Sequence, residues 1–426
     1  MMNTPADPAN ERLRFRRPIF VVVTLLLVFG AIRLMDTVGA FFLDTSAQYY
    51  VLPPGNVALG TNSLGLRNRE LGPKAGTRIL FLGDSFTQGL GVLEEDGFVR
   101  RSEKALRQRF QVEHVNAGMT GFSPGNELGL LRAIREKVQP DIVVLCLYQN
   151  DVYESGESLL LRRMKQNQQK KLGVRILFWI APNTANFVYR TFLQKTYNDL
   201  LMSQALTLDR TQAMLIASDS SREKQSQVVP ASAFQPALAL IQSEVRKYAK
   251  EMGADESVTD RWLAQNGQAL VDGRNPQEVL LGLLEPEYFS QVYGLDARAR
   301  PKFETMLKTI QRIKEETEQS GAAFAVVYIP SDVRYDKSKF DLMRSYGYAM
   351  DESWLHDRVP MGIELRHRME KENIPFLSLL DTFRRAPGPL TFPRDQHLNR
   401  HGHDVAAVAV AHFLEASFQS RIKPKN

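Results

Sequence analysis

Three short apolar runs, each followed at once by small or polar residues, constrain the fold of this chain more than any other feature. The runs are Ile79-Leu-Phe-Leu82 before Gly83-Asp84-Ser85, Val112-Glu-His-Val115 before Asn116-Ala-Gly118, and 141–148 before Gln149-Asn150-Asp151. Charged segments with apolar residues at helical spacing separate them, at 98–110 and 126–138. This alternation of strands and helices is typical of a parallel sheet with helices packed on its faces.

The same alternation resumes after residue 302. We expect a helix over 303–320, a strand over 322–330, a helix over 361–372, a strand over 374–380 and a last helix over 400–418. The last helix is expected to bury Val405, Val408, Ala409 and Phe413. The stretch between the halves has a helical and polar pattern without strand rhythm. We therefore predict a three-layer α/β/α sandwich with a parallel, flavodoxin-like sheet, formed by 75–151 and 303–420 and interrupted by a largely helical insert at 152–302.

The N-terminus carries a separate feature, an apolar run from Pro18 to Ile32 that four arginines precede. The run is short for a bilayer, but Leu34 and Met35 extend it if Arg33 reaches the interface. We expect a transmembrane anchor over 18–43, after a cytoplasmic basic tail at 1–17 and before a linker at 44–74. The arginines place the tail in the cytoplasm by the positive-inside rule, and the rest of the chain outside it.

Two other interpretations of this segment stay open. One is a cleaved signal peptide, for which Val38-Gly39-Ala40 offers a small-residue site, although Arg33 and Asp36 interrupt the approach to it. The other is a buried core helix, which four adjacent arginines disfavour. The predicted location is the cell membrane, single-pass, with the main domain extracytoplasmic and on the periplasmic side in a Gram-negative cell.

Composition excludes several classes of protein. Of the 426 residues, 43% are hydrophobic and 24% are charged, which is a globular balance. The single cysteine, Cys146, allows neither an intramolecular disulfide nor a cysteine-based zinc site. The net charge is only +6, and the basic run 162–175 has no interleaved aromatic residues, so we expect no nucleic-acid partner. That run leads into Ile176-Leu-Phe-Trp-Ile180, which fits either a membrane-surface segment or a solvated helix before a buried element.

The residues that follow the strands are the types that acyl transfer needs. Ser85 lies at a strand-to-helix turn, where a serine can act as a nucleophile. Gly121 and Asn150, in the neighbouring loops, can present N–H donors to an oxyanion. After a later strand, Asp395-Gln-His397 supplies a base and a carboxylate to orient it. In a parallel sheet these residues meet at the carboxyl edge of the strands.

These blocks resemble a known family. Gly83-Asp84-Ser85, Gly121, Asn150 and Asp395/His397, in this order, resemble the four signature blocks of the SGNH (GDSL) hydrolase superfamily. The lead-in Asn62-Ser-Leu-Gly-Leu-Arg67 and the stretch 78–92 are similar to those of its membrane-anchored bacterial members.

The resemblance implies a role for each residue. Ser85 would be the nucleophile, His397 the base, Asp395 the residue that orients it, and the Ser85 N–H, the Gly121 N–H and the Asn150 side chain the oxyanion hole. Supporting roles are expected for Asp84, which would bond loop amides, and for Asn399, which would cap the last helix.

Two departures from the family pattern bear on function. Tyr148 stands where the third block usually has a glycine, and we expect it to narrow the crevice beside Asn150. One residue separates Asp395 from His397, where many members have two. The shorter spacing is similar to that of bacterial polysaccharide O-acetyltransferases of the superfamily, so transfer to a sugar hydroxyl stays open.

The expected function is that of a serine esterase, an acyl-ester hydrolase working through an acyl-enzyme on Ser85 at an extracytoplasmic membrane surface. The alternative is an O-acetyltransferase or deacetylase of an envelope or exported polysaccharide, and a third is a non-catalytic binding protein. The expected partners are the membrane and an acyl ester or acylated carbohydrate. No cofactor and no metal are expected, because a helix from Asn399 would set His401 and His403 about 200° apart.

Overall fold

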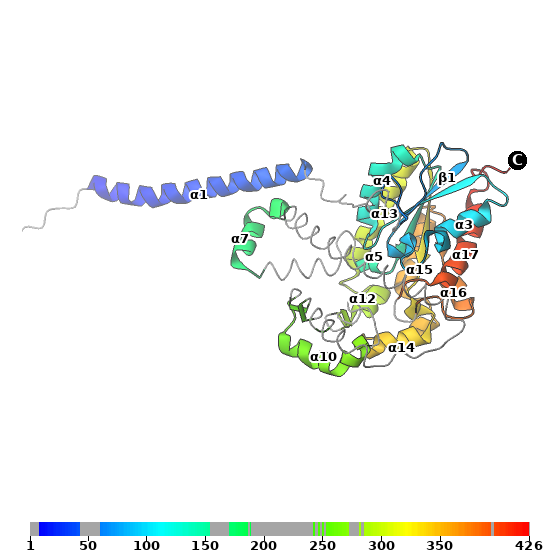
Figure 1. Ribbon diagram of the computed structural model, residues 1–426. Helices are drawn as coiled ribbons and strands as arrows, with labels where there is room; N and C mark the ends of the chain where they lie inside the picture. Colours follow the sequence, from blue (N-terminus) through cyan, green and yellow to red (C-terminus); the bar gives the residue numbers. More distant parts are fainter. Residues whose placement is uncertain are drawn as a thin grey trace, which may run out of the picture. The chain divides into compact units, whose positions relative to one another are not determined.

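The computed structural model describes residues 8–42, 60–153, 170–185, 188, 242, 246–247, 249–250, 253–271, 281–282, 285–392 and 396–425. The chain divides into two compact units, residues 1–45 with 163–198 and residues 46–162 with 199–426. The first unit contains α1 (Pro8–Phe42) and α7 (Leu172–Ile180). The second unit contains the sheet and the other labelled elements (Figure 1).

The second unit begins with the alternation that the sequence predicts. Its first half holds β1 (Thr77–Gly83), α2 (Ser85–Gln88), α3 (Phe98–Leu106), β2 (Val112–Gly118), α4 (Pro124–Val138), β3 (Ile142–Tyr148) and α5 (Asn150–Tyr153). From the insert come α10 (Glu256–Val271) and α12 (Tyr288–Gly294). The second half holds α13 (Arg300–Gln319), β4 (Ala323–Ile329), α14 (Lys337–Ser345), α15 (Pro360–Lys371), β5 (Phe376–Ser378), α16 (Leu380–Arg385) and α17 (Arg400–Phe418).

The five strands form one sheet in the order β2-β1-β3-β4-β5, with every neighbouring pair parallel. This is the flavodoxin-like order, and it confirms the predicted sheet. The pairing of β3 with β4 joins the halves of the chain on either side of the insert. Val144 pairs with Ala325 and Leu145 with Val326, in the middle of both strands. The insert therefore interrupts one sheet and does not separate two.

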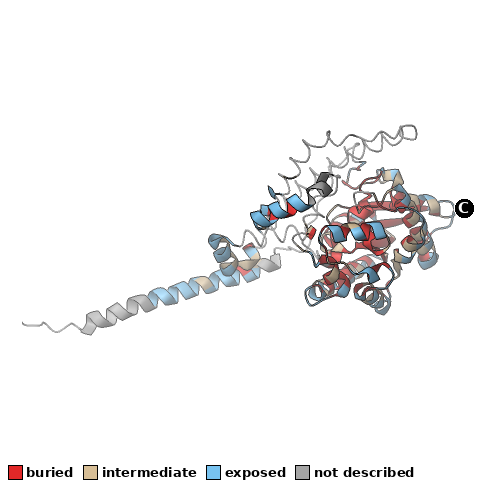
Figure 2. Ribbon diagram, turned by 90° about the horizontal axis from the view of Figure 1, so that it is seen from below, coloured by how far each residue is buried: buried red, intermediate tan, exposed pale blue. Residues whose placement is uncertain are grey.

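Helices cover both faces of the sheet, so the predicted three layers are present (Figure 1). α4 and α13 lie on one face, and α3 and α17 lie on the other. All seven residues of β1 and of β3 are buried, which is why these strands are almost continuously apolar (Figure 2). On the face of α3 and α17, one apolar cluster joins Phe81 and Val144 of the sheet to Phe98 of α3 and Val410 of α17.

The buried face of α17 differs from the predicted one. The helix buries Ala406, Ala407, Val410, Ala411, Leu414 and Phe418. Val408 is 55% exposed, so the expectation that it faces the core was wrong. Val405, Ala409 and Phe413 are partly buried at the edge of the same cluster. The predicted face was displaced because three of the residues that α17 buries are alanines, which give a weak apolar pattern.

The first unit is built on α1, a helix of 35 residues. Among the described residues, α1 is the helix that is long and apolar enough to cross a membrane, over Phe20–Gly39. Its apolar side chains stand mostly exposed, and Leu25, Leu27 and Met35 are each more than 60% exposed (Figure 2). A span near the N-terminus is compatible with an anchor or with a signal sequence.

His114 on β2 gives the fold a measurable dependence on pH. The ring is fully buried, its Nδ1 lies 3.0 Å from the carbonyl oxygen of Val99, and burial lowers its pKa to about 3. In the unfolded chain the pKa is about 6.5. Between these values the unfolded state binds one more proton than the folded state, so this contribution to stability falls as the pH drops below 6.5.

We expect a His114→Gln variant to lose this pH-dependent contribution to stability. From pH 6 to pH 4 the free energy of unfolding of the wild type should fall by about 1.4 kcal/mol per pH unit more steeply than that of the variant. Urea unfolding of both proteins across this range measures the difference. His403, whose pKa burial also lowers to about 3, is present in both proteins and cancels. Equal slopes would show that His114 is protonated in the folded protein.

Candidate active site

The predicted nucleophile and oxyanion donors follow three adjacent strands. Ser85 begins α2 two residues after β1, Gly121 lies in the turn three residues after β2, and Asn150 begins α5 two residues after β3. The parallel register sets Gly83 opposite Gly118, so the strands end at the same edge of the sheet. In this strand order the crevice lies where connections leave β1 and β3 in opposite directions, and that is where Ser85 and Asn150 are.

His397 lies against Ser85. The His397 Nε2 and the Ser85 Oγ are 2.8 Å apart, although 312 residues separate them in the sequence. Each residue is 8% exposed, so the pair is almost covered by protein yet not sealed. This distance is hydrogen-bond reach, the geometry in which a neutral imidazole can accept a hydroxyl proton.

Asp84 holds the start of α2 and thereby the position of Ser85. Its carboxylate accepts the N–H of Phe86 at 2.9 Å and so caps α2, whereas the expected role of Asp84 was to bond loop amides. Burial raises the pKa of Asp84 to about 6, and the charge of His397 acts in the opposite direction. Burial and the charge of Asp84 raise the pKa of Glu127, on α4, well above its ordinary value.

Side-chain hydrogen bonds of Asn116 and Gln88 join the loop after β2 to α2. The Asn116 side chain donates to the Thr87 carbonyl at 2.9 Å and accepts the Gly118 N–H at 2.9 Å. The Gln88 Oε1 accepts the Thr120 N–H at 2.8 Å and the Thr120 hydroxyl at 2.6 Å. Gly121 follows at once, with a φ of 74° that favours glycine. These bonds fix the glycine loop to the short helix that carries Ser85.

Arg67 braces the other end of α2. Its guanidinium donates to the carbonyl oxygens of Gln88, Gly89 and Val92. The neighbouring Leu66 is fully buried, so this part of the expected linker packs on the domain. No role was predicted for Arg67 from the sequence. Its position in the lead-in block 62–67 was the signal from which this role could have been predicted.

Tyr148 lies beside the histidine loop. Its ring stacks on Phe86 with centroids 4.0 Å apart, and Phe86 in turn lies 4.8 Å from the His397 ring. The Tyr148 hydroxyl donates to Gln396 Oε1 at 2.8 Å. Tyr148 is only 3% exposed, and its hydrogen bond to Gln396 connects β3 to the loop that carries His397. Asp395, the expected orienting carboxylate, lies outside the described residues, between Phe392 and Gln396.

The remaining histidines near the site have partners elsewhere. His403 Nδ1 accepts the Phe98 N–H at 3.1 Å in the core, whereas His401 is exposed on the opposite side of α17. Asn399 caps this helix, as expected, by accepting the Gly402 N–H at 2.9 Å. Among the described residues no group of three His, Cys, Asp or Glu side chains could hold a metal ion. Burial raises the pKa of the Cys146 thiol, which leaves it unreactive inside β3.

The last part of the insert reaches the end of β3. The Tyr293 hydroxyl of α12 donates to Gln149 Oε1, next to Asn150 in the chain. The same ring packs edge-on against Trp354, with centroids 5.0 Å apart. Gln149 and Tyr293 are both buried. The insert therefore contributes to the wall beside the site, a role for which its sequence gave no signal.

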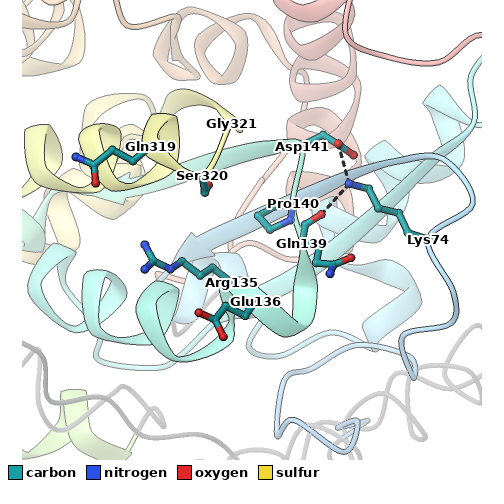
Figure 3. Close-up of a pocket in the computed structure, with 9 residues that line it drawn as sticks. All are labelled: Lys74, Arg135, Glu136, Gln139, Pro140, Asp141, Gln319, Ser320 and Gly321. Atoms are coloured by element: carbon teal, nitrogen blue, oxygen red, sulfur yellow. Dashed lines mark hydrogen bonds and ion pairs between the residues drawn. The ribbon is translucent and has the colours of Figure 1, made fainter.

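A surface hollow elsewhere in the same unit has no part in this chemistry (Figure 3). It is lined by Lys74, Arg135, Glu136, Gln139, Pro140, Asp141, Gln319, Ser320 and Gly321. These residues precede β3 and β4, so the hollow lies at the amino edge of the sheet, opposite Ser85. Its Lys74 ammonium is already paired with Asp141, 2.7 Å away.

Similar solved structures include a lipolytic protein, an alpha/beta hydrolase and an acetylxylan esterase, each at low identity. The chain is similar to a lipolytic protein of the G-D-S-L family from Desulfitobacterium hafniense, at 9% identity and a TM-score of 0.35 over 79% of this chain and 99% of that one. It is similar to an alpha/beta hydrolase from the metagenome of Lake Arreo, at 14% identity and 0.32 over 80% and 95%. A catalytic mutant of an acetylxylan esterase from Geobacillus stearothermophilus matches at 12% identity and 0.31 over 80% and 96%.

These likenesses are too weak to carry an argument about activity or substrate. No family model matches the chain, and no curated protein matches it either. The chemistry has to be argued from the residues of this chain.

Proposed function

We propose that this protein is a serine esterase of the SGNH type. The observation that carries the proposal is the 2.8 Å separation of the His397 Nε2 and the Ser85 Oγ at the carboxyl edge of a parallel sheet. Ser85 attacks the carbonyl carbon of an ester, and His397 accepts the proton of the hydroxyl as the bond forms. Asp395 orients the imidazole and stabilises its charge.

The oxyanion that develops on the carbonyl is met by the Ser85 N–H, the Gly121 N–H and the Asn150 side chain. Their places at the ends of three adjacent strands support this role. The tetrahedral intermediate collapses when His397 returns its proton to the leaving alkoxide, which departs as an alcohol. Water then attacks the acyl-enzyme, with His397 again as base, and the products are a carboxylic acid and free Ser85.

The reaction takes place at a membrane surface outside the cytoplasm. The support is the exposed apolar helix α1, with its candidate span Phe20–Gly39, and the four arginines that precede it. On this basis the protein is single-pass, anchored by 18–43, with a discontinuous catalytic domain at 75–151 and 303–420. The substrate is an acyl ester or an acylated carbohydrate presented at that surface.

A second candidate, O-acetyl transfer to or removal from an envelope or exported polysaccharide, shares the acyl-enzyme. The single residue between Asp395 and His397 favours it, by the resemblance described above. In the transferase a sugar hydroxyl replaces water in the second step. A purely binding role is disfavoured by the close Ser85–His397 contact, which binding alone does not require.

Covalent labelling tests the proposed function. The purified full-length protein in detergent is treated with a fluorophosphonate probe and digested, and we expect the modified peptide to be the one that contains Ser85. Protein denatured before treatment is the control and should stay unlabelled, because the free serine hydroxyl is a weak nucleophile. Absence of labelling together with absence of p-nitrophenyl acetate turnover would overturn the proposal.

The products separate the two candidates. The protein is incubated with an acetyl donor and an oligosaccharide, and mass spectrometry measures acetylated sugar against free acetate. A hydrolase yields acetate alone, whereas acetylated sugar in excess over acetate would establish the transferase.

A further inference from the structure

Within the first unit, the insert returns to the N-terminal helix. The ring of Trp179, near the end of α7, stacks on Phe29 of α1 with centroids 4.8 Å apart. The Arg33 guanidinium donates to the Trp179 carbonyl at 3.5 Å. The segment 172–185 thus packs on the part of α1 from Phe29 to Asp36, away from the arginine tail.

Asp36 is the strongest point of this contact. Its carboxylate accepts the backbone N–H of Asn183 at 3.0 Å and of Thr184 at 2.7 Å, and the Asn183 amide at 3.1 Å. These are the first N–H groups of the helical turn 182–185, which the carboxylate caps. Asp36 is 4% exposed, although the apolar side chains around it on α1 are open. The carboxylate in the candidate span is thus stabilised by hydrogen bonds from the insert, as a polar group in an apolar phase has to be.

α7 also carries apolar side chains that are largely exposed, including Trp179 itself. Leu172 is 72% exposed, Trp179 is 65% exposed, and Ile176 and Leu177 are each at least 40% exposed. α7 has no acidic residue, and basic residues lie before it and within it at Lys170, Lys171 and Arg175. At nine residues it is about 14 Å long, far short of the ~30 Å hydrocarbon core. Basic residues beside exposed aromatic and aliphatic ones are typical of a helix that lies in the membrane interface.

We infer that the segment 172–185 is a second membrane element, a short helix that sits in the outer leaflet and is held against α1 by Asp36. Its apolar face contacts the acyl chains, and its basic residues contact anionic headgroups. The inference rests on the proposed anchoring by α1, but not on the proposed catalysis. It implies that the insert fastens the protein to the bilayer at a second point.

Tryptophan fluorescence in vesicles tests the inference. A full-length Trp262→Phe/Trp354→Phe variant keeps Trp179 as the sole tryptophan of the chain. It is reconstituted into vesicles of phosphatidylcholine and phosphatidylglycerol, with or without bromine on the acyl chains. We expect the bromines to lower Trp179 emission by about half, because an interfacial helix lies at the headgroup and acyl boundary. If that variant does not fold, the quenching lost on Trp179→Phe in the otherwise native chain gives the same quantity.

Asp36→Ala should abolish most of this quenching while the protein still floats with the vesicles. Thr37→Val, in the next position of α1, is the matched control and should keep it, because the Thr37 hydroxyl bonds only within the helix, to Arg33. Trp179 emission that bromines leave unchanged and aqueous iodide quenches would overturn the inference. Failure to float would overturn the anchor and the inference together. Labelling of Ser85 by fluorophosphonate reports separately on the proposed catalysis.

Discussion

Replacement of Ser85 by alanine is expected to lower kcat/KM for p-nitrophenyl acetate by about 10⁴- to 10⁶-fold, the range seen when a catalytic serine is removed. In the proposed mechanism the Oγ that lies 2.8 Å from His397 forms the acyl-enzyme, and alanine offers no substitute. The fold should be unchanged, because this hydroxyl is not part of the hydrogen bonds that tie α2 to the loop after β2. Initial rates measure the effect, and circular dichroism checks the fold.

A matched serine and a double variant make the result specific. Ser345→Ala, at the exposed end of α14, should leave the rate unchanged. Ser85→Ala combined with His397→Ala should be no slower than Ser85→Ala alone, because the two groups act as one unit. Activity above one hundredth of wild type in the single variant would move the nucleophile to another residue.

Gly118→Ala is expected to destabilise the protein by about 3 kcal/mol, at the upper end for overpacking. A Cβ at this position would lie 2.2 Å from the backbone nitrogen of Gln88 and 2.6 Å from the carbonyl carbon of Thr87. Both atoms are backbone, so no side-chain rotation can relieve the clash, and β2 must move from α2. Because α2 carries Ser85, fluorophosphonate labelling should slow as well. Urea unfolding measures the first effect and the time course of labelling the second.

Gly72→Ala is the control for this substitution. No atom lies within 4 Å of a Cβ built at Gly72, so its effect should stay within about 0.5 kcal/mol. If both variants unfolded at the same urea concentration, the close approach of β2 to α2 would not be a constraint on the fold.

The layered fold could be predicted because its strands are short, apolar and buried on both faces. Such a run ends at a definite residue, and the residue after it is bound to lie at the sheet edge, as Ser85 does. The contact face of α17 could not be predicted in the same way. Alanines give a weak signal for a helix face. The predicted face included Val408, which is exposed to solvent.

The candidate site, too, could be predicted from the sequence only in part. The proximity of Ser85 and His397 could be predicted because the types of these residues and their order in the sequence are informative. The partners of Gln88, Arg67 and Tyr148 could not, because each contacts a residue more than 20 positions away through a bond that no local pattern encodes. The contact of Tyr293 with Gln149 is also beyond local reasoning, because it spans most of the insert.

The 312 residues between Ser85 and His397 also have a consequence in time. A ribosome that adds about 5 to 20 residues per second needs roughly 15 to 60 seconds to pass from one to the other. For most of that interval β4 and β5 have not been synthesised, and until its end the serine has no base beside it. On the proposed mechanism, a nascent chain that has not yet reached His397 lacks the base that Ser85 needs and would not cleave esters.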